Sequence, residues 1–393
     1  MNIALIRDLV QRQEVEIKTG PFGTQLKASE YVNEGTPVLN VRNLGFSTVN
    51  TEKLEMVGNE TLERLSAHKL HTGDIVFGRK GAVERHAYIS ENEDGWLQGS
   101  DCIRLRVKSN NINARYLSYY FLTPQHRAFM ISMCSHGTTM ASLNQKIIEM
   151  ISVPLPDRRT QDQIVSILSS FDEKIKNNRK INDNLQQQAQ ALYKHYFPYS
   201  VGDELPDGWR IGSVGEIIEI HDSKRIPLSG AERAKMEKKT YPYYGAAALM
   251  DYVDDYIFDG KYLLLGEDGT VVDEAGYPIL QYVWGQFWVN NHAHILTGKL
   301  GFNVESLYML FKQTPVKAIV TGAVQPKISQ TNLRSIPVVI PPPKLLTDYN
   351  SQIEPLFALL RTNEETNKSL TALRDTLLPK LMSGELDVSN IQL

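Results

Sequence analysis

Two sets of residues have types and spacing that could support metal chemistry, and each set is incomplete. Asp157 followed by Asp172-Glu173-Lys174 has the order of acids and lysine with which nucleases hold a divalent metal and polarise water. His292 and His294 alternate in a strand-like run, so both face one side and could form half of a metal site. However, Asp172 to Lys174 lie inside a long heptad pattern, and no third ligand accompanies the histidines. We interpret the acidic set as a chance match and the histidines as structural residues or base contacts.

The motifs of common nucleotide-dependent enzymes are absent from the sequence. It contains no GxxxxGK[ST] loop and no GxGxxG after a strand, which argues against nucleotide hydrolysis and dinucleotide redox chemistry. The Pro341-Pro342-Pro343 run precedes Lys344 and lacks the aromatic residue with which adenine methyltransferases grip a base. Cys102 and Cys134 form no CxxC pair, which argues against structural zinc and for a reducing compartment. We therefore expect no catalytic residues, no metal site and no cofactor, and a cytoplasmic location.

The remaining chemistry lies in polar and aromatic loops suited to contacts with DNA bases and phosphates. Arginine reads guanine through two hydrogen bonds, whereas glutamine and asparagine read adenine. Each residue alone is typical of a solvated surface, but two clusters in two halves of the chain indicate bipartite binding. In the first half the candidates are Lys18, Thr19, Phe22, Thr24, Gln25, Lys27, Arg42, Arg79, Lys80, Arg85, His86, Thr138 and Thr139. In the second half they are His221, Lys224, Arg225, Tyr241, Tyr243, Tyr244, His292 and Lys327.

Composition limits how such contacts could hold DNA. The 393 residues suffice for two or three domains, and 42% hydrophobic with 22% charged residues is typical of folded proteins. The 42 Lys and Arg against 45 Asp and Glu give a net charge of −3. A protein that held DNA by diffuse attraction alone would be more basic, so binding must use local patches or a positively charged partner. No apolar run approaches the roughly 18 residues of a membrane span, and we expect neither export nor membrane insertion.

The elements that position these loops are duplicated within the chain. Residues Gly137, Leu143, Gln145, Ile148, Ile151 and Pro156 recur as Gly322, Ile328, Gln330, Leu333, Ile336 and Pro341, always 185 positions later (145 and 330, for example). The run from Val76 to Gly81 also parallels the run from Leu264 to Gly269, a strand that enters a tight charged turn. These matches predict two similar domains.

The same offset extends into two heptad patterns, at 160–197 and 345–382, that predict long helices. Asn178 and Asn182 in the first seam correspond to Asn363 and Asn367 in the second, and paired amides would fix the register between two helices. We expect the helices to pack on each other; the alternative is two solvated helices on separate domains. Pro355 indicates that the second helix either starts near it or kinks there.

These patterns predict an α+β protein with two similar mixed α/β domains and two long helices. The expected boundaries are 1–156 for the first domain, 157–198 for the first helix, 199–342 for the second domain and 343–393 for the second helix with the C-terminal tail. A helix over 160–196 would be roughly 55 Å long, which is the length of a spacer.

Specific motifs give the chain a resemblance to the DNA specificity subunit of type I restriction-modification enzymes, over essentially its whole length. The motifs are Gly137-Thr138-Thr139 through Leu143-Asn144-Gln145, Val153 to Pro156 followed by Gln161 to Ile164, the copy from Gly322 to Pro343, and the openings Gly20 to Gly23 and Pro206 to Trp209. The second copy departs from the pattern at Leu345 to Asp348, where the usual glutamine of the helix entrance is replaced.

The resemblance implies a noncatalytic subunit in which two target-recognition domains each read one half of an asymmetric, interrupted site in double-stranded DNA. It also implies that the helices form an antiparallel coiled coil, which sets the gap between the half-sites and docks two methyltransferase subunits. Those partners would bind S-adenosylmethionine, and separate restriction motor-nuclease subunits would cleave DNA. The alternatives are a fused restriction endonuclease or methyltransferase with its own recognition domain, and a protein-interaction scaffold that uses the coiled coil alone.

Overall fold

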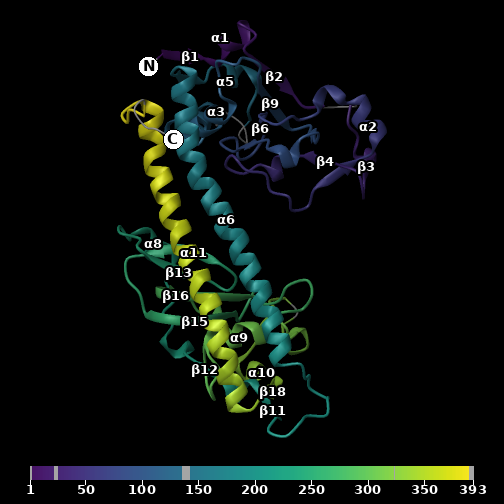
Figure 1. Ribbon diagram of the computed structural model, residues 1–393, viewed down its shortest axis with the longest axis vertical. Coiled ribbons are helices and arrows are strands. Elements are labelled where there is room, and N and C mark those ends of the chain that lie inside the picture. The colour runs from purple at the N-terminus through teal and green to yellow at the C-terminus, as the bar shows by residue number, and fades with distance from the viewer. Residues whose placement is uncertain (1, 22–24, 135–141, 323, 389–393) are drawn as a thin grey trace. The chain divides into compact units, whose positions relative to one another are not determined.

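The computed structural model describes residues 2–21, 25–134, 142–322 and 324–388, with the element order shown in Figure 1. It divides into two compact units, one formed by Met1–Lys176 with Thr366–Leu393 and the other by Asn177–Glu365. Two long helices, α6 (Arg158–Tyr196) and α11 (Pro343–Ser383), each contribute to both units. Each unit therefore contains one mixed α/β domain and a segment of each long helix, and the predicted fold class is confirmed.

The first unit is built on two four-stranded sheets and a strand pair. Their orders are β2-β9-β6-β7, β3-β5-β4-β8 and β1-β10. The strands are β1 (Asn2–Leu5), β2 (Val15–Thr19), β3 (Tyr31–Val32), β4 (Thr36–Leu39), β5 (Glu55–Val57), β6 (Ile75–Gly78), β7 (His86–Tyr88), β8 (Leu97–Gln98), β9 (Cys102–Val107) and β10 (Ser152–Leu155). The helices are α1 (Ile6–Gln11), α2 (Asn59–Arg64), α3 (Ala114–Tyr120), α4 (Pro124–Cys134) and α5 (Gln145–Glu149), with 3-10 turns at Ala28–Glu30, Val41–Asn43, Ser66–His68 and Glu91–Glu93.

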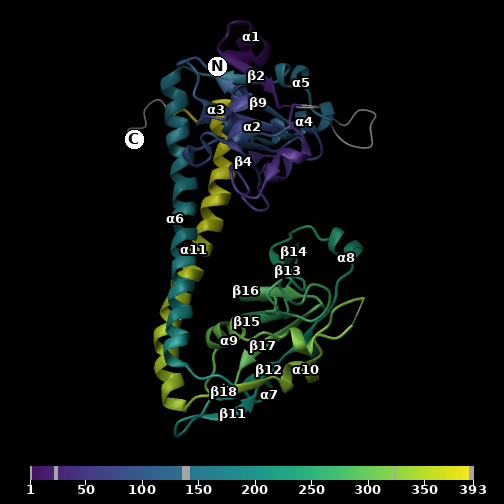
Figure 2. The ribbon, with the colours of Figure 1, turned by 90° about the vertical axis from the view of Figure 1, so that its right-hand side faces the viewer.

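The second unit is built on one six-stranded sheet of order β12-β17-β15-β16-β13-β14 and a strand pair, β11-β18. The strands are β11 (Arg210–Ser213), β12 (Ile218–Ile220), β13 (Tyr241–Tyr244), β14 (Leu249–Val253), β15 (Phe258–Gly266), β16 (Leu280–Val289), β17 (Ala293–Gly298) and β18 (Pro337–Ile340). The helices are α7 (Val214–Ile217), α8 (Gly230–Ala234), α9 (Val304–Phe311) and α10 (Gln330–Ser335), with 3-10 turns at Asp222–Lys224 and Lys317–Ile319. Figure 2 shows α9 between this sheet and α11.

The apolar runs of the sequence become central strands whose two faces are both covered. In β6, Ile75 and Phe77 pack in the cluster that contains α3, α6 and α11, while Val76 packs in a second cluster on the opposite face. In β15, Leu263 and Leu265 face the long helices, whereas Leu264 packs against Phe287. Because successive strand residues point to opposite faces, a fully apolar run requires this double covering. Each such side chain contributes roughly 1.5–3 kcal/mol on burial.

The two domains share a topology, which confirms the predicted internal repeat. The antiparallel order β2-β9-β6-β7 in the first sheet corresponds to β12-β17-β15-β16 in the second. The Leu143 amide donates to the Arg79 carbonyl at 2.8 Å, and the Ile328 amide donates to the Glu267 carbonyl at the same distance. Isolated β-bridges then join Lys80 to Ser142 and Asp268 to Lys327. Ser142 and Leu143 match Lys327 and Ile328 at the 185-residue offset, while their partners Arg79 and Lys80 match Glu267 and Asp268 at an offset of 188, so the repeat extends to backbone contacts as well as residue types.

The two long helices pack on each other in antiparallel orientation within each unit, as expected. In the second unit, Asn363 Nδ2 donates to Asn182 Oδ1 at 2.8 Å, and Gln352 donates to the hydroxyl of Tyr196 further along. In the first unit, Arg374 pairs with Asp172 at 2.8 Å. Asn178 and Asn367 are also buried. The role of the four asparagines in fixing register stays a prediction.

Helix α11 begins at Pro343 and continues past Pro355, so the alternative that it starts near Pro355 is wrong. Pro355 and Ser351 are both exposed on this helix. The Ser351 carbonyl, which receives no amide hydrogen from a proline four residues later, can therefore be hydrated. Among the helices that the structure describes, none is long and apolar enough to cross a membrane.

Candidate DNA interface

The predicted contact residues of the first domain come from several loops. Phe22, Thr24, Thr138 and Thr139 lie outside the described residues. Thr19 ends β2, where its hydroxyl accepts a hydrogen bond from Gln145 at 2.9 Å. Lys18 is half-buried on the same strand, and Gln25, Lys27, Lys80 and Arg85 are exposed. Arg42 is exposed but pairs with Glu55 at 3.0 Å, and Arg79 is half-buried with its carbonyl bound by Leu143.

The structure contradicts three of the predicted DNA contacts. The His86 side chain is fully buried, with Nε2 2.9 Å from Ser118 Oγ, and burial lowers its pKa to about 3. Tyr243 is also buried, and its hydroxyl accepts from the Leu228 amide at 3.0 Å. The guanidinium of Arg225 binds Glu267 at 2.5 Å and the Ala293 carbonyl at 2.8 Å. A buried or fully engaged side chain presents no donor to DNA, so these predictions are wrong, and each of the three residues instead makes structural contacts within its own domain.

The other predicted residues of the second domain keep some exposure. Lys224 is exposed, and none of the described residues forms an ion pair with it. His292 Nδ1 lies 2.5 Å from Asp268, and Lys327 lies 3.2 Å from Glu267. Tyr241, Tyr244 and His221 are half-buried; burial raises the pKa of Tyr244 to about 12 and lowers the pKa of His221.

A buried polar cluster on β17 has the residue types of a metal site but the hydrogen bonds of a structural one. Single ligand atoms of Asp222, Glu267 and His294 lie within 4.8 Å of one another. However, His294 Nδ1 lies 2.6 Å from Asp222 Oδ2, and its Nε2 lies 2.8 Å from the Ile328 carbonyl oxygen. Arg225 supplies positive charge between the two carboxylates. Both nitrogens of His294 are occupied, so the geometry makes it a structural histidine.

The acidic set with nuclease-like spacing does not converge. Asp157 accepts a hydrogen bond from the Thr160 amide at 3.0 Å in the first turn of α6. Asp172 lies in the same helix, where it accepts from the Tyr119 hydroxyl at 2.6 Å and pairs with Arg374. Fifteen residues of helix separate the two carboxylates by roughly 22 Å, which is too far to share a metal ion.

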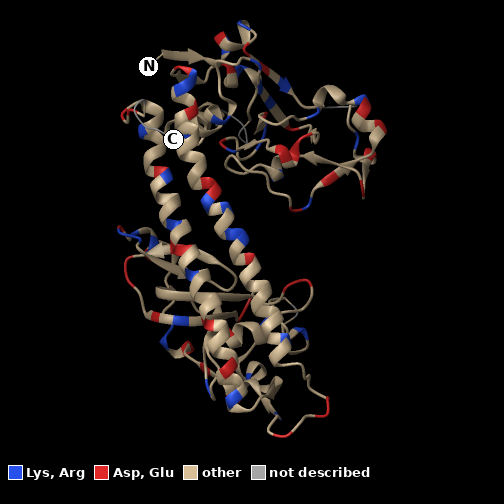
Figure 3. Cartoon of the chain, viewed as in Figure 1, with Lys and Arg blue, Asp and Glu red and all other residues tan. Residues whose placement is uncertain are grey.

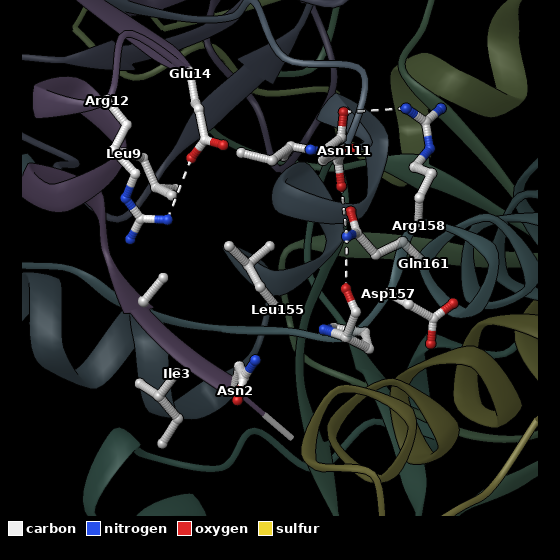
Figure 4. Close-up of a pocket in the computed structure, with 13 residues that line it drawn as sticks. Asn2, Ile3, Leu9, Arg12, Glu14, Asn111, Leu155, Asp157, Arg158 and Gln161 are labelled. Carbon is white, nitrogen blue, oxygen red and sulfur yellow. Dashed lines mark hydrogen bonds and ion pairs between the residues drawn. The ribbon is translucent and has the colours of Figure 1, made fainter.

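A pocket of about 550 Å³ lies in the first unit beside β1, α1 and the start of α6 (Figure 4). Several polar side chains at its wall already have partners. Arg12 pairs with Glu14 at 3.6 Å, Arg158 donates to the Asn110 carbonyl at 2.7 Å, and Gln161 donates to the Asn111 carbonyl at 3.0 Å. These interactions join the domain to the start of α6, so the residues that line the pocket have a structural role.

Charges of both signs are distributed over the chain, as Figure 3 shows along both long helices. Local features therefore matter more than net charge. One such feature was missed by sequence reasoning: Phe46 is exposed, and the guanidiniums of Arg85 and Arg127 lie over its ring. Because Arg127 is far from Phe46 in the sequence and lies in a different element, no local pattern could have found it.

Two similar α/β domains joined by paired antiparallel helices define a duplicated recognition scaffold. Comparison with known proteins gives its family: the model of the type I restriction modification DNA specificity domain matches residues 17–187 and again residues 206–371. The chain therefore belongs to this family and is a DNA specificity subunit of a type I restriction-modification system. The resemblance stated from the motifs is confirmed. Because the specificity subunits of this family are noncatalytic, the alternative of a fused endonuclease or methyltransferase is set aside.

Individual relatives support the same assignment. The chain is 24% identical over 315 residues to the specificity subunit of the type I restriction enzyme MjaIX from Methanocaldococcus jannaschii, which covers 72% of each chain. It is 21% identical over 397 residues to the MjaVIII specificity subunit of the same organism, covering 93% of this chain and 86% of the relative. The crystal structure of the S subunit of the type I restriction-modification system from M. genitalium matches 99% of this chain and 96% of its own, with a TM-score of 0.60 and 17% identity. This last likeness shows the fold.

Proposed function

We propose that each α/β domain reads one half of an asymmetric, interrupted site in double-stranded DNA. The observation that carries the proposal is a charge reversal at equivalent positions of the two domains. The backbone bonds of Arg79 and Glu267 are equivalent, yet the residue that follows is Lys80 in one loop and Asp268 in the other; Glu267 itself is bound by Arg225 and is not a proposed contact. A guanidinium or ammonium donates to guanine, whereas a carboxylate accepts from cytosine. Two loops with equivalent backbone hydrogen bonds but side chains of opposite charge suit two different half-sites.

The proposed contact residues are the predicted ones that the described structure leaves accessible, and those that lie outside the described residues, within recognition domains that span 1–156 and 199–342. In the first domain they are Lys18, Thr19, Gln25, Lys27, Arg42, Arg79, Lys80 and Arg85, together with Phe22, Thr24, Thr138 and Thr139. In the second they are His221, Lys224, Tyr241, Tyr244, His292 and Lys327.

The paired helices are proposed to set the gap between half-sites and to dock two methyltransferase subunits. Their outer surface carries exposed apolar side chains, among them Ile181, Leu359 and Leu373, which are 42%, 46% and 46% exposed. Apolar side chains at such positions on a long helix favour contact with another protein. The methyltransferases would bind S-adenosylmethionine and flip the adenine, motor-nuclease subunits would cleave unmodified DNA, and the assembly would work in the cytoplasm. Partner subunits that close around the duplex would also supply phosphate contacts, which makes a net charge of −3 tolerable.

Mapping of methylated adenines tests the proposal. The chain is expressed with the methyltransferase subunits of its own system in a host that methylates no adenine, and the genome is sequenced for methyladenine. The expected result is one split motif with a fixed gap. Insertion of seven residues into α6 and seven into α11 at facing positions is expected to lengthen the gap and keep both half-motifs. A continuous motif, or a gap unchanged by the insertions, would contradict the proposal.

A further inference from the structure

An exposed aromatic side chain in the first domain carries two arginines that come from different elements. Phe46 is 40% exposed at the tip of a turn formed by residues 44–49. The guanidinium carbon of Arg127, on α4, lies 4.5 Å from the centre of the Phe46 ring. That of Arg85, in the loop before β7, lies 5.6 Å from the same point. An exposed cation–π contact contributes only about 0.5–1 kcal/mol, so the cluster does little for stability.

The turn that presents Phe46 is held rigidly by buried hydrogen bonds. The Ser47 amide donates to the His86 carbonyl at 2.8 Å, and the His86 amide donates to the Gly45 carbonyl at 3.1 Å. The Ser47 hydroxyl lies 2.6 Å from Ser118 Oγ, which in turn contacts the His86 ring. Backbone and side-chain hydrogen bonds at this turn favour one conformation, so the aromatic ring is held in place before any ligand arrives.

Among the described residues, no acidic side chain pairs with the two arginines over this ring. Arg12, Arg42 and Arg64 are exposed in the same unit, and each pairs with a glutamate. Within the described part of the chain, neither Arg85 nor Arg127 forms an ion pair. Two like charges gathered on one ring repel each other, and a bound anion would relieve that repulsion.

We propose that Arg85 and Arg127, oriented by Phe46, form a clamp for DNA phosphates in the first recognition domain. This proposal rests on the proposed function and gives these residues a positioning task within it. Guanidiniums that stack on a ring keep their N–H edges free for the paired hydrogen bonds that phosphate oxygens accept. Contacts to phosphates fix the register of a protein on the duplex without reading its sequence. Arg85, predicted above as a DNA contact without a choice between bases and phosphates, is therefore proposed to act on the backbone.

Salt dependence of binding tests the clamp. The chain, assembled with its methyltransferase subunits, is titrated over a series of salt concentrations with two duplexes, one with the mapped split motif and one of random sequence. Each phosphate contact contributes about −0.9 to the slope of log K against log salt, which corresponds to roughly fivefold in affinity at 0.15 M salt. We expect Arg85→Ala and Arg127→Ala each to lower the affinity for both duplexes by about fivefold and to reduce the magnitude of the slope by about 0.9. The double variant should lower the affinity by roughly 30-fold.

Two further variants serve as controls. Arg12→Ala removes an exposed arginine that is already paired with Glu14, and we expect it to leave the slope unchanged. Arg127→Lys keeps a cation that can neutralise a phosphate, so the slope should return to the wild-type value. Because all these side chains are exposed, the thermal unfolding midpoint should not change in any variant.

Two outcomes would overturn the clamp: unchanged slopes in both alanine variants, or a loss of affinity confined to the motif duplex, which would indicate base reading. The proposed function fails separately, if the wild-type assembly does not prefer the motif duplex to the random one. Even then, the slopes on random DNA still decide whether the clamp exists.

Discussion

Removal of the Asp222 carboxylate should strongly destabilise the second recognition domain. This side chain is buried at the end of β12, where Oδ1 accepts from the Ile295 amide at 3.0 Å. Its Oδ2 lies 2.6 Å from both His294 Nδ1 and Gln330 Nε2, and Arg225 forms an ion pair with it at 3.4 Å. One carboxylate therefore joins β12, β17, α10 and the segment that carries Arg225.

The magnitude follows from the groups that an Asp222→Ala change leaves unpaired. Loss of one member of a buried ion pair costs about 3–5 kcal/mol, because the partner charge stays buried without compensation. Each buried neutral donor left without an acceptor costs about 1–3 kcal/mol. Water that enters the vacated space offsets part of these costs, so we expect a loss of about 3–5 kcal/mol in the free energy of unfolding. For a domain of this size the thermal midpoint should fall by roughly 6–20 °C.

Chemical denaturation of the full chain measures this effect, with Glu274→Ala as the control because Glu274 is exposed. Burial alone would raise the pKa of Asp222, but the hydrogen bond from His294 and the nearby charges hold that pKa below its ordinary value. A carboxyl with a lowered pKa in the folded state stabilises it at neutral pH and loses this contribution as the pH falls below about 4. The difference between wild type and variant should therefore shrink in acid. A loss below about 1 kcal/mol at neutral pH would refute the role of Asp222 as the central acceptor.

Two further predictions concern buried polar groups. Asn363→Leu leaves the Asn182 oxygen without its donor and should lower the free energy of unfolding, measured by chemical denaturation, by about 1–3 kcal/mol. The double variant with Asn182→Leu should recover most of this loss. A double variant less stable than the single variant would contradict the pairing. Burial lowers the pKa values of His86 and His126 to about 3, so unfolding takes up protons as the pH falls below about 6.5. We expect roughly 2 kcal/mol of stability per histidine to be lost between pH 6.5 and pH 5, and a His126→Gln variant that keeps the full pH dependence would contradict this.

The fold could be predicted from periodic patterns because those patterns are local. Heptad spacing predicted α6 and α11 to within a few residues at each end, and the buried Asn182 to Asn363 contact agrees with the seam. The 185-residue offset predicted the repeat, since equivalent residues close equivalent hydrogen bonds. In contrast, the Pro355 pattern left two alternatives, because a proline on the solvent face of a helix need not end it.

The candidate site was less predictable because exposure depends on contacts between distant segments. His86 lies on β7, which pairs with β6, and α3 covers its ring through Ser118. Arg225 resembles a DNA contact in sequence, yet its guanidinium is bound by Glu267, 42 residues away. No local pattern distinguishes a cation aimed at DNA from one aimed at a carboxylate on the next strand. Sequence can supply the types of the reading residues, but only the sheet register decides which of them reach solvent.

The equivalent glutamines Gln145 and Gln330 show how one backbone arrangement can support two specificities. Gln145 begins α5 and donates to Thr19 at the end of β2, while Gln330 begins α10 and donates to Asp222 directly after β12. Each glutamine thus fixes a short helix against the equivalent strand end, and backbone bonds fix the loop beside it. Because backbone groups and the two glutamine amides hold this arrangement, the outward side chains of the loops are free to differ. The reversal from Lys80 to Asp268 between the two domains is therefore compatible with an unchanged fold and with two different half-sites.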